Sequence, residues 1–145
     1  MDDIDIKILR VLEKEGRITH EEISKRLNLS RPAIYQRVTK LEQTGVIKGY
    51  KTDIEWSKAG QPLRALVFIS VKTSDFNSLM DEIVSLDIKG LDIEECLRIT
   101  GQWCIMLRIR AEETAQITLL HDEVLKIQGV TETFTMLILS EKGLN

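Results

Sequence analysis

The N-terminal end of the chain contains a short amphipathic segment. Ile4, Ile8 and Val11 recur at intervals of three or four residues, which places them on one face of an α-helix. Gly16 follows the last of these apolar positions and is typical of a helix end. The pattern therefore predicts a helix that begins near Ile4 and ends at Gly16.

Two more helices are predicted next, and only a short turn separates them. Thr19 and Glu22 match the capping-box pattern at the start of a helix that we expect to run to Leu27. Asn28 suits a left-handed position after a helix, and Ser30 is a favourable N-cap for the next one. A turn of about three residues is the connection that helix-turn-helix domains use.

The third predicted helix has two faces of different chemistry. Pro32 suits its first turn, and Ile34, Val38 and Leu41 form an apolar stripe. Its other positions carry side chains of the kind that bind base edges and phosphates in a major groove. These residues are Arg31, Tyr35, Gln36, Thr39, Lys40 and Gln43. We therefore expect this helix to be the one that enters the DNA.

Gly45 ends the third helix, and residues 46–51 are predicted to form a short strand and turn. This segment carries two lysines and would be the wing of a winged helix, which contacts the DNA backbone beside the groove. The candidate DNA-binding residues are Lys25, Ser30, Arg31, Pro32, Tyr35, Gln36, Arg37, Lys40, Lys48 and Lys51. Arg37 could equally brace its helix against neighbouring helices, and a generic three-helix bundle with a solvated basic face is the alternative for the whole segment.

The charge distribution favours a nucleic-acid partner for the N-terminal part alone. Residues 1–52 carry 11 basic and 8 acidic residues, whereas residues 53–145 carry 9 basic and 15 acidic ones. Within residues 23–52 there are seven basic residues and one acid. Such a basic patch on an otherwise acidic protein is expected where one surface meets the phosphates of double-stranded DNA.

The C-terminal part alternates strand and helix patterns. Residues 53–62 contain turn formers without periodicity and are predicted to be a linker between a winged helix-turn-helix domain (1–52) and a second domain (63–145). Strands are predicted at 63–72, 93–100, 104–110 and 130–139, and helices at 75–86 and 113–127. The order βαββαβ predicts a ferredoxin-like α+β domain whose two helices cover one face of an antiparallel sheet. The other face is also rich in apolar residues, so we expect a homodimer that buries it.

The sequence contains little that would support catalysis, a cofactor or a metal site. His20 lies in the predicted capping turn and His121 beside two acids, so both are expected at the surface. Cys96 and Cys104 form neither a zinc pattern nor a disulfide framework. No apolar run reaches the roughly 18 residues that span a bilayer, so we expect no membrane partner and a cytoplasmic location.

Several motifs in fixed order resemble one family of regulators. Residues 3–17 and 22–30, then Arg-x-x-x-Leu-Glu at 37–42 and Gly-x-Ile-x-Gly-Tyr at 45–50, are similar to the N-terminal domain of the Lrp/AsnC (feast/famine) transcriptional regulators. The resemblance implies that the C-terminal βαββαβ domain is of the RAM type, which dimerises and binds an effector. It also implies that the dimers can assemble further, to tetramers or octamers.

The resemblance further implies an amino-acid pocket at the turn between the two middle strands. That turn is usually Gly-Asp-x-Asp in the family, whereas here it is Gly101-Gln102-Trp103-Cys104. The candidate effector-binding residues are Thr100, Gly101, Gln102, Trp103, Cys104, Thr133 and Thr135. Because both acids are missing, we expect weakened or altered binding of a small-molecule effector, an amino acid or a related metabolite. A turn that only packs dimers together is the alternative, and an architectural DNA-binding protein without effector response is the alternative for the whole chain.

Overall fold

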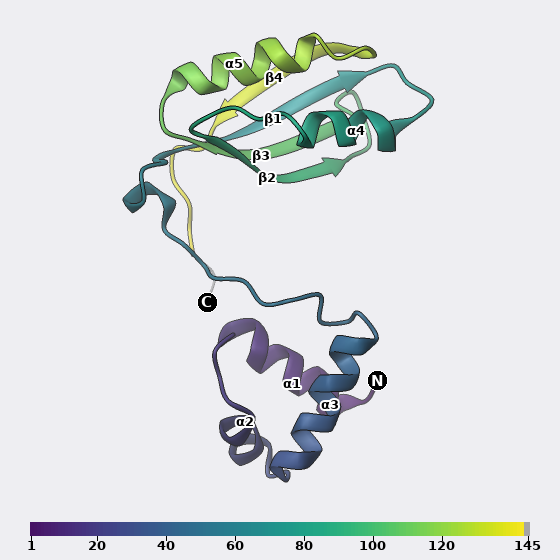
Figure 1. Cartoon of the computed structure of the whole chain (residues 1–145), viewed down its shortest axis with the longest axis vertical. Coiled ribbons are helices and arrows are strands. Elements are labelled where there is room, and N and C mark those ends of the chain that lie inside the picture. Colours follow the sequence, from purple (N-terminus) through teal and green to yellow (C-terminus); the bar gives the residue numbers. More distant parts are fainter. Residues whose placement is uncertain (144–145) are drawn as a thin grey trace. The chain divides into compact units, whose positions relative to one another are not determined.

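The computed structural model describes residues 1–143, which form two compact units, Met1–Ile54 and Glu55–Gly143. The N-terminal unit contains the helices α1 (Asp3–Lys14), α2 (His20–Leu27) and α3 (Arg31–Gln43) (Figure 1). Its core is formed by five buried residues, and they come from all three helices. They are Ile8, Ile23, Ile34, Val38 and Leu41.

The helix starts follow the capping patterns in the sequence. The Thr19 hydroxyl accepts a hydrogen bond from the backbone amide of Glu22, and the Glu22 carboxylate accepts one from the amide of Thr19. Asp2 caps α1 in the same reciprocal way with Asp5. These bonds satisfy amides that have no partner inside the helix and so fix where each helix begins.

The segment 46–51 differs from its prediction. It contains a bend at Val46 and Ile47 and no strand. The amide of Ile47 donates to the carbonyl of Leu41 at 3.0 Å, and the Ile47 side chain packs against the helical core. A strand forms only where a second strand completes its hydrogen bonds. No strand within residues 1–143 pairs with the segment 46–51.

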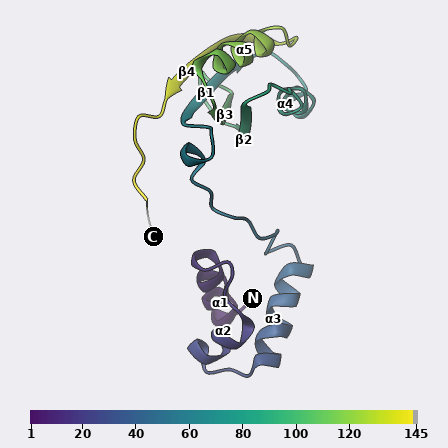
Figure 2. The same ribbon diagram turned by 60° about the vertical axis from the view of Figure 1, so that its left-hand side comes forward.

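The C-terminal unit has the predicted order βαββαβ. Its elements are β1 (Leu63–Val71), α4 (Phe76–Val84), β2 (Leu91–Arg98), β3 (Ile105–Ala111), α5 (Thr114–Leu125) and β4 (Val130–Leu137). All neighbouring strands are antiparallel, in the sheet order β2-β3-β1-β4. Figure 2 shows α4 and α5 on the same face of this sheet. The ferredoxin-like prediction is confirmed.

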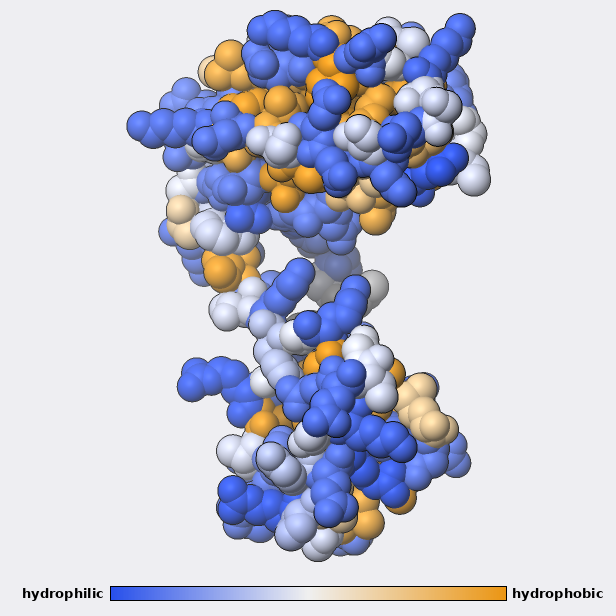
Figure 3. Space-filling view, turned by 45° about the vertical axis from the view of Figure 1, so that its right-hand side comes forward, coloured by the Kyte–Doolittle hydropathy of each residue, from blue (hydrophilic) through white to orange (hydrophobic). Residues whose placement is uncertain are grey.

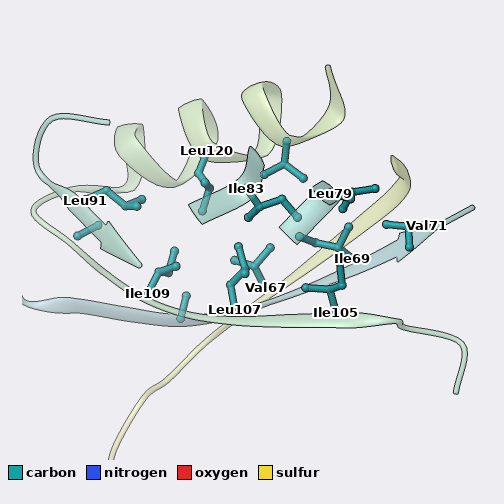
Figure 4. Close-up of a cluster of buried hydrophobic side chains, with 13 residues drawn as sticks. Val67, Ile69, Val71, Leu79, Ile83, Leu91, Ile105, Leu107, Ile109 and Leu120 are labelled. Carbon is teal, nitrogen blue, oxygen red and sulfur yellow. The ribbon is translucent and has the colours of Figure 1, made fainter. Parts of the chain in front are cut away.

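The central strands β1 and β3 alternate between the two faces of the sheet. Ile69, Leu107 and Ile109 are fully buried beneath the helices, where they pack with Ile83 of α4 and Leu120 of α5 (Figure 4). The residues between them point to the opposite face, which we call the outer face of the sheet. Each fully buried aliphatic side chain contributes about 1.5–3 kcal/mol of transfer free energy, so this layer holds the unit together.

The outer face of the sheet carries large apolar side chains that remain partly exposed. Leu66 and Phe68 of β1 lie opposite Met136 and Phe134 of β4 in the strand register. Phe134 keeps 49% of its surface exposed. Hydrophobic residues also gather in several places on the surface of this unit seen in Figure 3. None of the helices within residues 1–143 is long and apolar enough to cross a membrane.

Candidate nucleic-acid interface and ligand turn

The connection between α2 and α3 is fixed by backbone geometry. Asn28 has a left-handed conformation with φ of 54°, as predicted for the residue after α2. The amide of Leu29 donates to the carbonyl of Ser24, and the Ser30 hydroxyl accepts from the amide of Ala33. Three residues therefore connect the two helices, which is the geometry of a helix-turn-helix.

One side of α3 is buried and the other is open to solvent. Ile34, Val38 and Leu41 lie in the helical core, as the apolar stripe predicted. The candidate DNA-binding residues on the opposite side are exposed, namely Arg31, Pro32, Tyr35, Gln36 and Lys40. Tyr35 also contacts the ring of His20 edge to face, with 5.8 Å between the ring centroids. Within α3, a guanidinium, an amide and an ammonium group are therefore exposed to solvent.

Ion pairs divide the basic residues of this unit into two groups. Lys25 lies 3.7 Å from Glu21, and Arg26 forms a two-pronged pair with Glu15. Arg37 pairs with two aspartates at the start of α1. Four candidate cations make no ion pair with any residue in 1–143: Arg31, Lys40, Lys48 and Lys51. These four can bind phosphate or base edges without first losing a carboxylate partner.

The contacts of Arg37 favour a structural role, in which it braces α3 against the start of α1. One nitrogen of its guanidinium lies 2.8 Å from Asp2 Oδ2 and 3.0 Å from Asp5 Oδ1. The hydrogen bond from Arg37, together with the amide of Asp5, lowers the pKa of Asp2 from 3.8 to about 2. The same carboxylates raise the pKa of Arg37. Asp2 and Asp5 were not among the predicted functional residues, because a partner more than 30 positions away leaves no local pattern.

The turn between β2 and β3 is pinned to the sheet at its end. The amide of Cys104 donates to the carbonyl of Ile69 at 2.9 Å, and the carbonyl of Cys104 accepts from Ile99 at 2.8 Å. Gly101 has φ of +107°, and no atom outside residues 100–102 lies within 4 Å of the position a Cβ would occupy. Thr100 and Gln102 are exposed as well. A single chain therefore leaves the tip of the turn open.

The other candidate effector residues lie on two faces of the sheet. The Trp103 ring stacks on Phe134, with 5.8 Å between centroids and 21° between planes, on the outer face. Thr133 and Thr135 alternate with Phe134 along β4 and so point to the helix side. The Thr133 hydroxyl hydrogen-bonds there with Nδ1 of His121 on α5. The structure thus brings Trp103 to β4, but the two threonines face away from its ring.

Neither cysteine belongs to a cluster. Cys96 lies opposite Leu107 in the strand register, and its partial burial raises the pKa of its thiol. The Cys104 sulfur lies 3.9 Å from the carbonyl oxygen of Val71. Within the described residues no three histidine, cysteine, aspartate or glutamate side chains gather in a way that could hold a metal ion.

Comparison with known families gives a match over both units. A winged helix-turn-helix DNA-binding family matches residues 1–48, and the Lrp/AsnC ligand binding domain matches residues 64–143. The C-terminal match alone spans more than half of the chain.

Individual proteins match along almost their whole length. The HTH-type transcriptional regulator LrpC of Bacillus subtilis is 33% identical over 97% of this chain and 93% of its own. The leucine-responsive regulatory protein of Haemophilus influenzae is 32% identical over 97% of this chain and 85% of its own. The solved structure of B. subtilis LrpC superimposes with a TM-score of 0.85, at 31% identity, and the match covers 100% of this chain and 99% of that one.

The pair between Asp2 and Arg37 should make the N-terminal unit sensitive to acid. Because the pKa of Asp2 is about 2 in the folded protein and 3.8 ordinarily, its stabilising contribution is present above about pH 4 and is lost as the pH falls towards 2. We expect Asp2→Asn to lower the melting temperature at pH 7. The difference in melting temperature between Asp2→Asn and wild type should shrink through this window to a small fraction of its pH 7 value at pH 2, as measured by circular dichroism melts.

Asparagine is also a good N-cap, so Asp2→Asn tests the ion pair rather than the cap. Asp3→Asn is the matched control, because Asp3 is exposed in the first turn of α1 and makes no ion pair within residues 1–143. A difference between Asp2→Asn and wild type that stayed constant from pH 7 to pH 2 would contradict the role of this pair.

Proposed function

The chain belongs to the Lrp/AsnC family of transcriptional regulators, and we propose that it is a sequence-specific DNA-binding regulator modulated by a small molecule. The family consists of regulators rather than enzymes. The observation that carries the DNA-binding part is the exposed face of α3, where the cations Arg31 and Lys40 have no acidic partner within residues 1–143. The effector is proposed to be an amino acid or a related metabolite that changes DNA binding or assembly.

The candidate DNA-binding residues differ in what they can recognise. A guanidinium binds guanine and an amide binds adenine through two hydrogen bonds each, so Arg31 and Gln36 are the proposed base-contacting residues. Lys40, Lys48 and Lys51 present single charged amines, which suit phosphates. The Ser30 hydroxyl accepts its capping bond and still has a proton to donate to a phosphate.

We propose that the outer face of the sheet joins two chains. A dimer with a two-fold axis presents two copies of α3, so it should prefer a pseudo-palindromic site with half-sites about one helical turn, roughly 34–36 Å, or a multiple of it apart. Assembly of such dimers into tetramers or octamers would bring further chains next to the open turn at Gly101.

The proposed effector site is this turn, completed by a neighbouring chain. A relative with 32% identity is named for its response to leucine, which supports an amino acid as the class of ligand. Gln102 and Cys104 offer no carboxylate to hold an ammonium group, so recognition would depend on backbone groups and neutral side chains. Trp103 and Phe134 add apolar surface beside them.

Substitutions on α3 and in the segment 46–51 should separate sequence preference from general affinity. Arg31→Ala and Gln36→Ala should each relax preference at particular base positions by about 1–3 kcal/mol. Lys40→Ala, Lys48→Ala and Lys51→Ala should weaken binding to all sequences and lower the salt slope by about one unit each. Site selection from random DNA and anisotropy titrations at several salt concentrations would measure both quantities.

The exposed Lys72, in the C-terminal unit, provides the matched control, and Lys72→Ala should change neither quantity. Unchanged affinity and unchanged site selection in both Arg31→Ala and Gln36→Ala would exclude α3 as the DNA-reading helix. Equal affinity of wild type for selected and random DNA at matched salt would instead favour an architectural DNA-binding protein.

The dimer should depend on the apolar outer face of the sheet. Phe134→Glu places a charge where two sheets would meet, so we expect it to halve the mass of the dimer in light scattering at micromolar concentration. Leu119→Glu is the control, because Leu119 on α5 is 51% exposed, close to the 49% of Phe134, but lies in the helix layer. A monomeric wild type would contradict the proposed dimer, and dissociation by Leu119→Glu alone would place the interface on the helices.

Restoring an acid to the turn should strengthen amino-acid binding. Gln102→Asp provides a carboxylate for the ammonium group, which should improve affinity by about 1.5–3 kcal/mol, or roughly ten- to hundredfold. Gln102→Asn is the neutral control of the same shape and should behave like wild type. Thermal shift or calorimetry with the common amino acids and related metabolites would measure the effect.

Two outcomes would contradict the proposed effector site. The absence of stabilisation by every compound at millimolar concentration, in wild type and in Gln102→Asp, would favour a turn that only packs dimers together. Binding that survives Gly101→Trp would place the pocket elsewhere.

A further inference from the structure

Residues 55–62, predicted as part of the linker at 53–62, are held on the C-terminal unit. Trp56–Lys58 forms one turn of 3-10 helix, and the carbonyl of Trp56 accepts from the amides of Ala59 and Gln61 at 3.0 and 2.9 Å. Only 8% of Gln61 is exposed, in contrast to Pro62 beside it. The segment therefore has its own structure and a buried polar side chain.

Gln61 is bound at both ends of its amide. Its nitrogen donates to Asp92 Oδ2 at 2.7 Å and to the carbonyl of Gly90 at 3.3 Å. Its oxygen accepts from Nε of Arg110 at 2.7 Å. A buried amide that is satisfied on both sides fixes one position of the chain, because leaving either end unpaired away from water is costly.

Arg110 connects this amide to an aromatic ring and to the sheet. Its guanidinium carbon lies 4.0 Å from the centroid of the Trp56 ring, a cation–π contact. The guanidinium also lies 3.4 Å from Glu94 and 3.5 Å from Asp92. The Arg110 side chain is only 17% exposed, so water screens these contacts less than at the open surface. Trp56, Gln61 and Arg110 together are called the linker anchor below.

We propose that the linker anchor sets which half-site spacings the protein accepts on DNA, by shortening the free chain between its two units. This inference depends on the proposed function as a dimer that binds paired half-sites. Residues 48–54 contain no helix or strand, whereas Trp56 and Gln61 are fixed. Release of the eight residues 55–62 would add up to roughly 26–29 Å of reach per chain. That length exceeds the roughly 17 Å by which five inserted base pairs displace a half-site, so the anchor determines whether a displaced half-site can be reached.

The chemistry of the anchor offers graded variants. Trp56→Ala removes the ring beneath Arg110, whereas Trp56→Phe keeps an aromatic face. Arg110→Lys keeps the charge but loses the planar group that both stacks and donates to Gln61. Lys58→Ala changes an exposed residue of the same segment that makes no ion pair within residues 1–143, and it is the matched control.

The decisive experiment compares paired half-sites at several spacings. The half-sites come from selection on random DNA, and fragments with 0, 5 or 10 inserted base pairs are titrated with the full chain at one salt concentration. For wild type and Lys58→Ala we expect an affinity loss of about tenfold or more at 5 inserted base pairs, because one α3 then faces the wrong side of the helix. For Trp56→Ala and Arg110→Lys we expect this loss to fall to about threefold or less, with Trp56→Phe between the two. Affinity for a single half-site should not change, which a general loss of stability could not explain.

Limited trypsin digestion tests the anchor without DNA. Cleavage after Lys58 should be at least several times faster in Trp56→Ala and Arg110→Lys than in wild type, because the released segment can enter the protease. A sharp wild-type spacing profile that Trp56→Ala and Arg110→Lys leave unchanged would overturn the proposed role of the anchor and leave the proposed function intact. A wild type that binds no paired half-sites would contradict the proposed function itself.

Discussion

The alternation of side chains along β3 is the constraint on which the C-terminal unit depends. Ile105, Leu107 and Ile109 are fully buried under the helices, so the residues between them must point to the outer face. A shift by one residue would expose all three buried side chains, and the register is therefore strongly fixed. The same strand follows the open turn at one end and carries Arg110 at the other, so its packing positions both the proposed ligand site and the linker anchor.

In the N-terminal unit, ion pairs at the surface decide which basic residues remain available for DNA. Acidic side chains of α1, α2 and the residues beside them neutralise some basic residues, as Asp2 and Asp5 do for Arg37. Such pairs occupy Arg37, whereas four candidate cations have no acidic partner within residues 1–143 and remain available for DNA: Arg31, Lys40, Lys48 and Lys51. DNA affinity depends on how many phosphates are neutralised. The number of cations that can bind phosphate therefore matters more than the total number of basic residues.

The sequence was informative where interactions are local. The capping box at Thr19 follows from hydrogen bonds that join residues three positions apart, and the buried stripe of α3 follows from helical periodicity. Contacts between distant residues left no such pattern. Neither the bonds of Gln61 with Asp92 and Arg110 nor the stacking of Trp103 on Phe134 could be predicted, since each depends on strand register and loop path. The segment 46–51 has strand-forming residues, but strand formation needs a partner, which sequence pattern alone does not provide.

The open turn bears on how an effector could act in the proposed function. A ligand bound at Gly101 of a single chain would gain few contacts, because no atom outside residues 100–102 lies within 4 Å of where a Cβ would be. Most of its binding energy would then come from a neighbouring chain, and a ligand that binds the assembly more tightly than the separate chains must stabilise the assembly by mass action. Ligand and assembly are then coupled reciprocally without any change of shape inside the unit. A regulator of this kind alters DNA binding through the number of α3 helices held together, and their permitted separation is the quantity that the linker anchor is proposed to set.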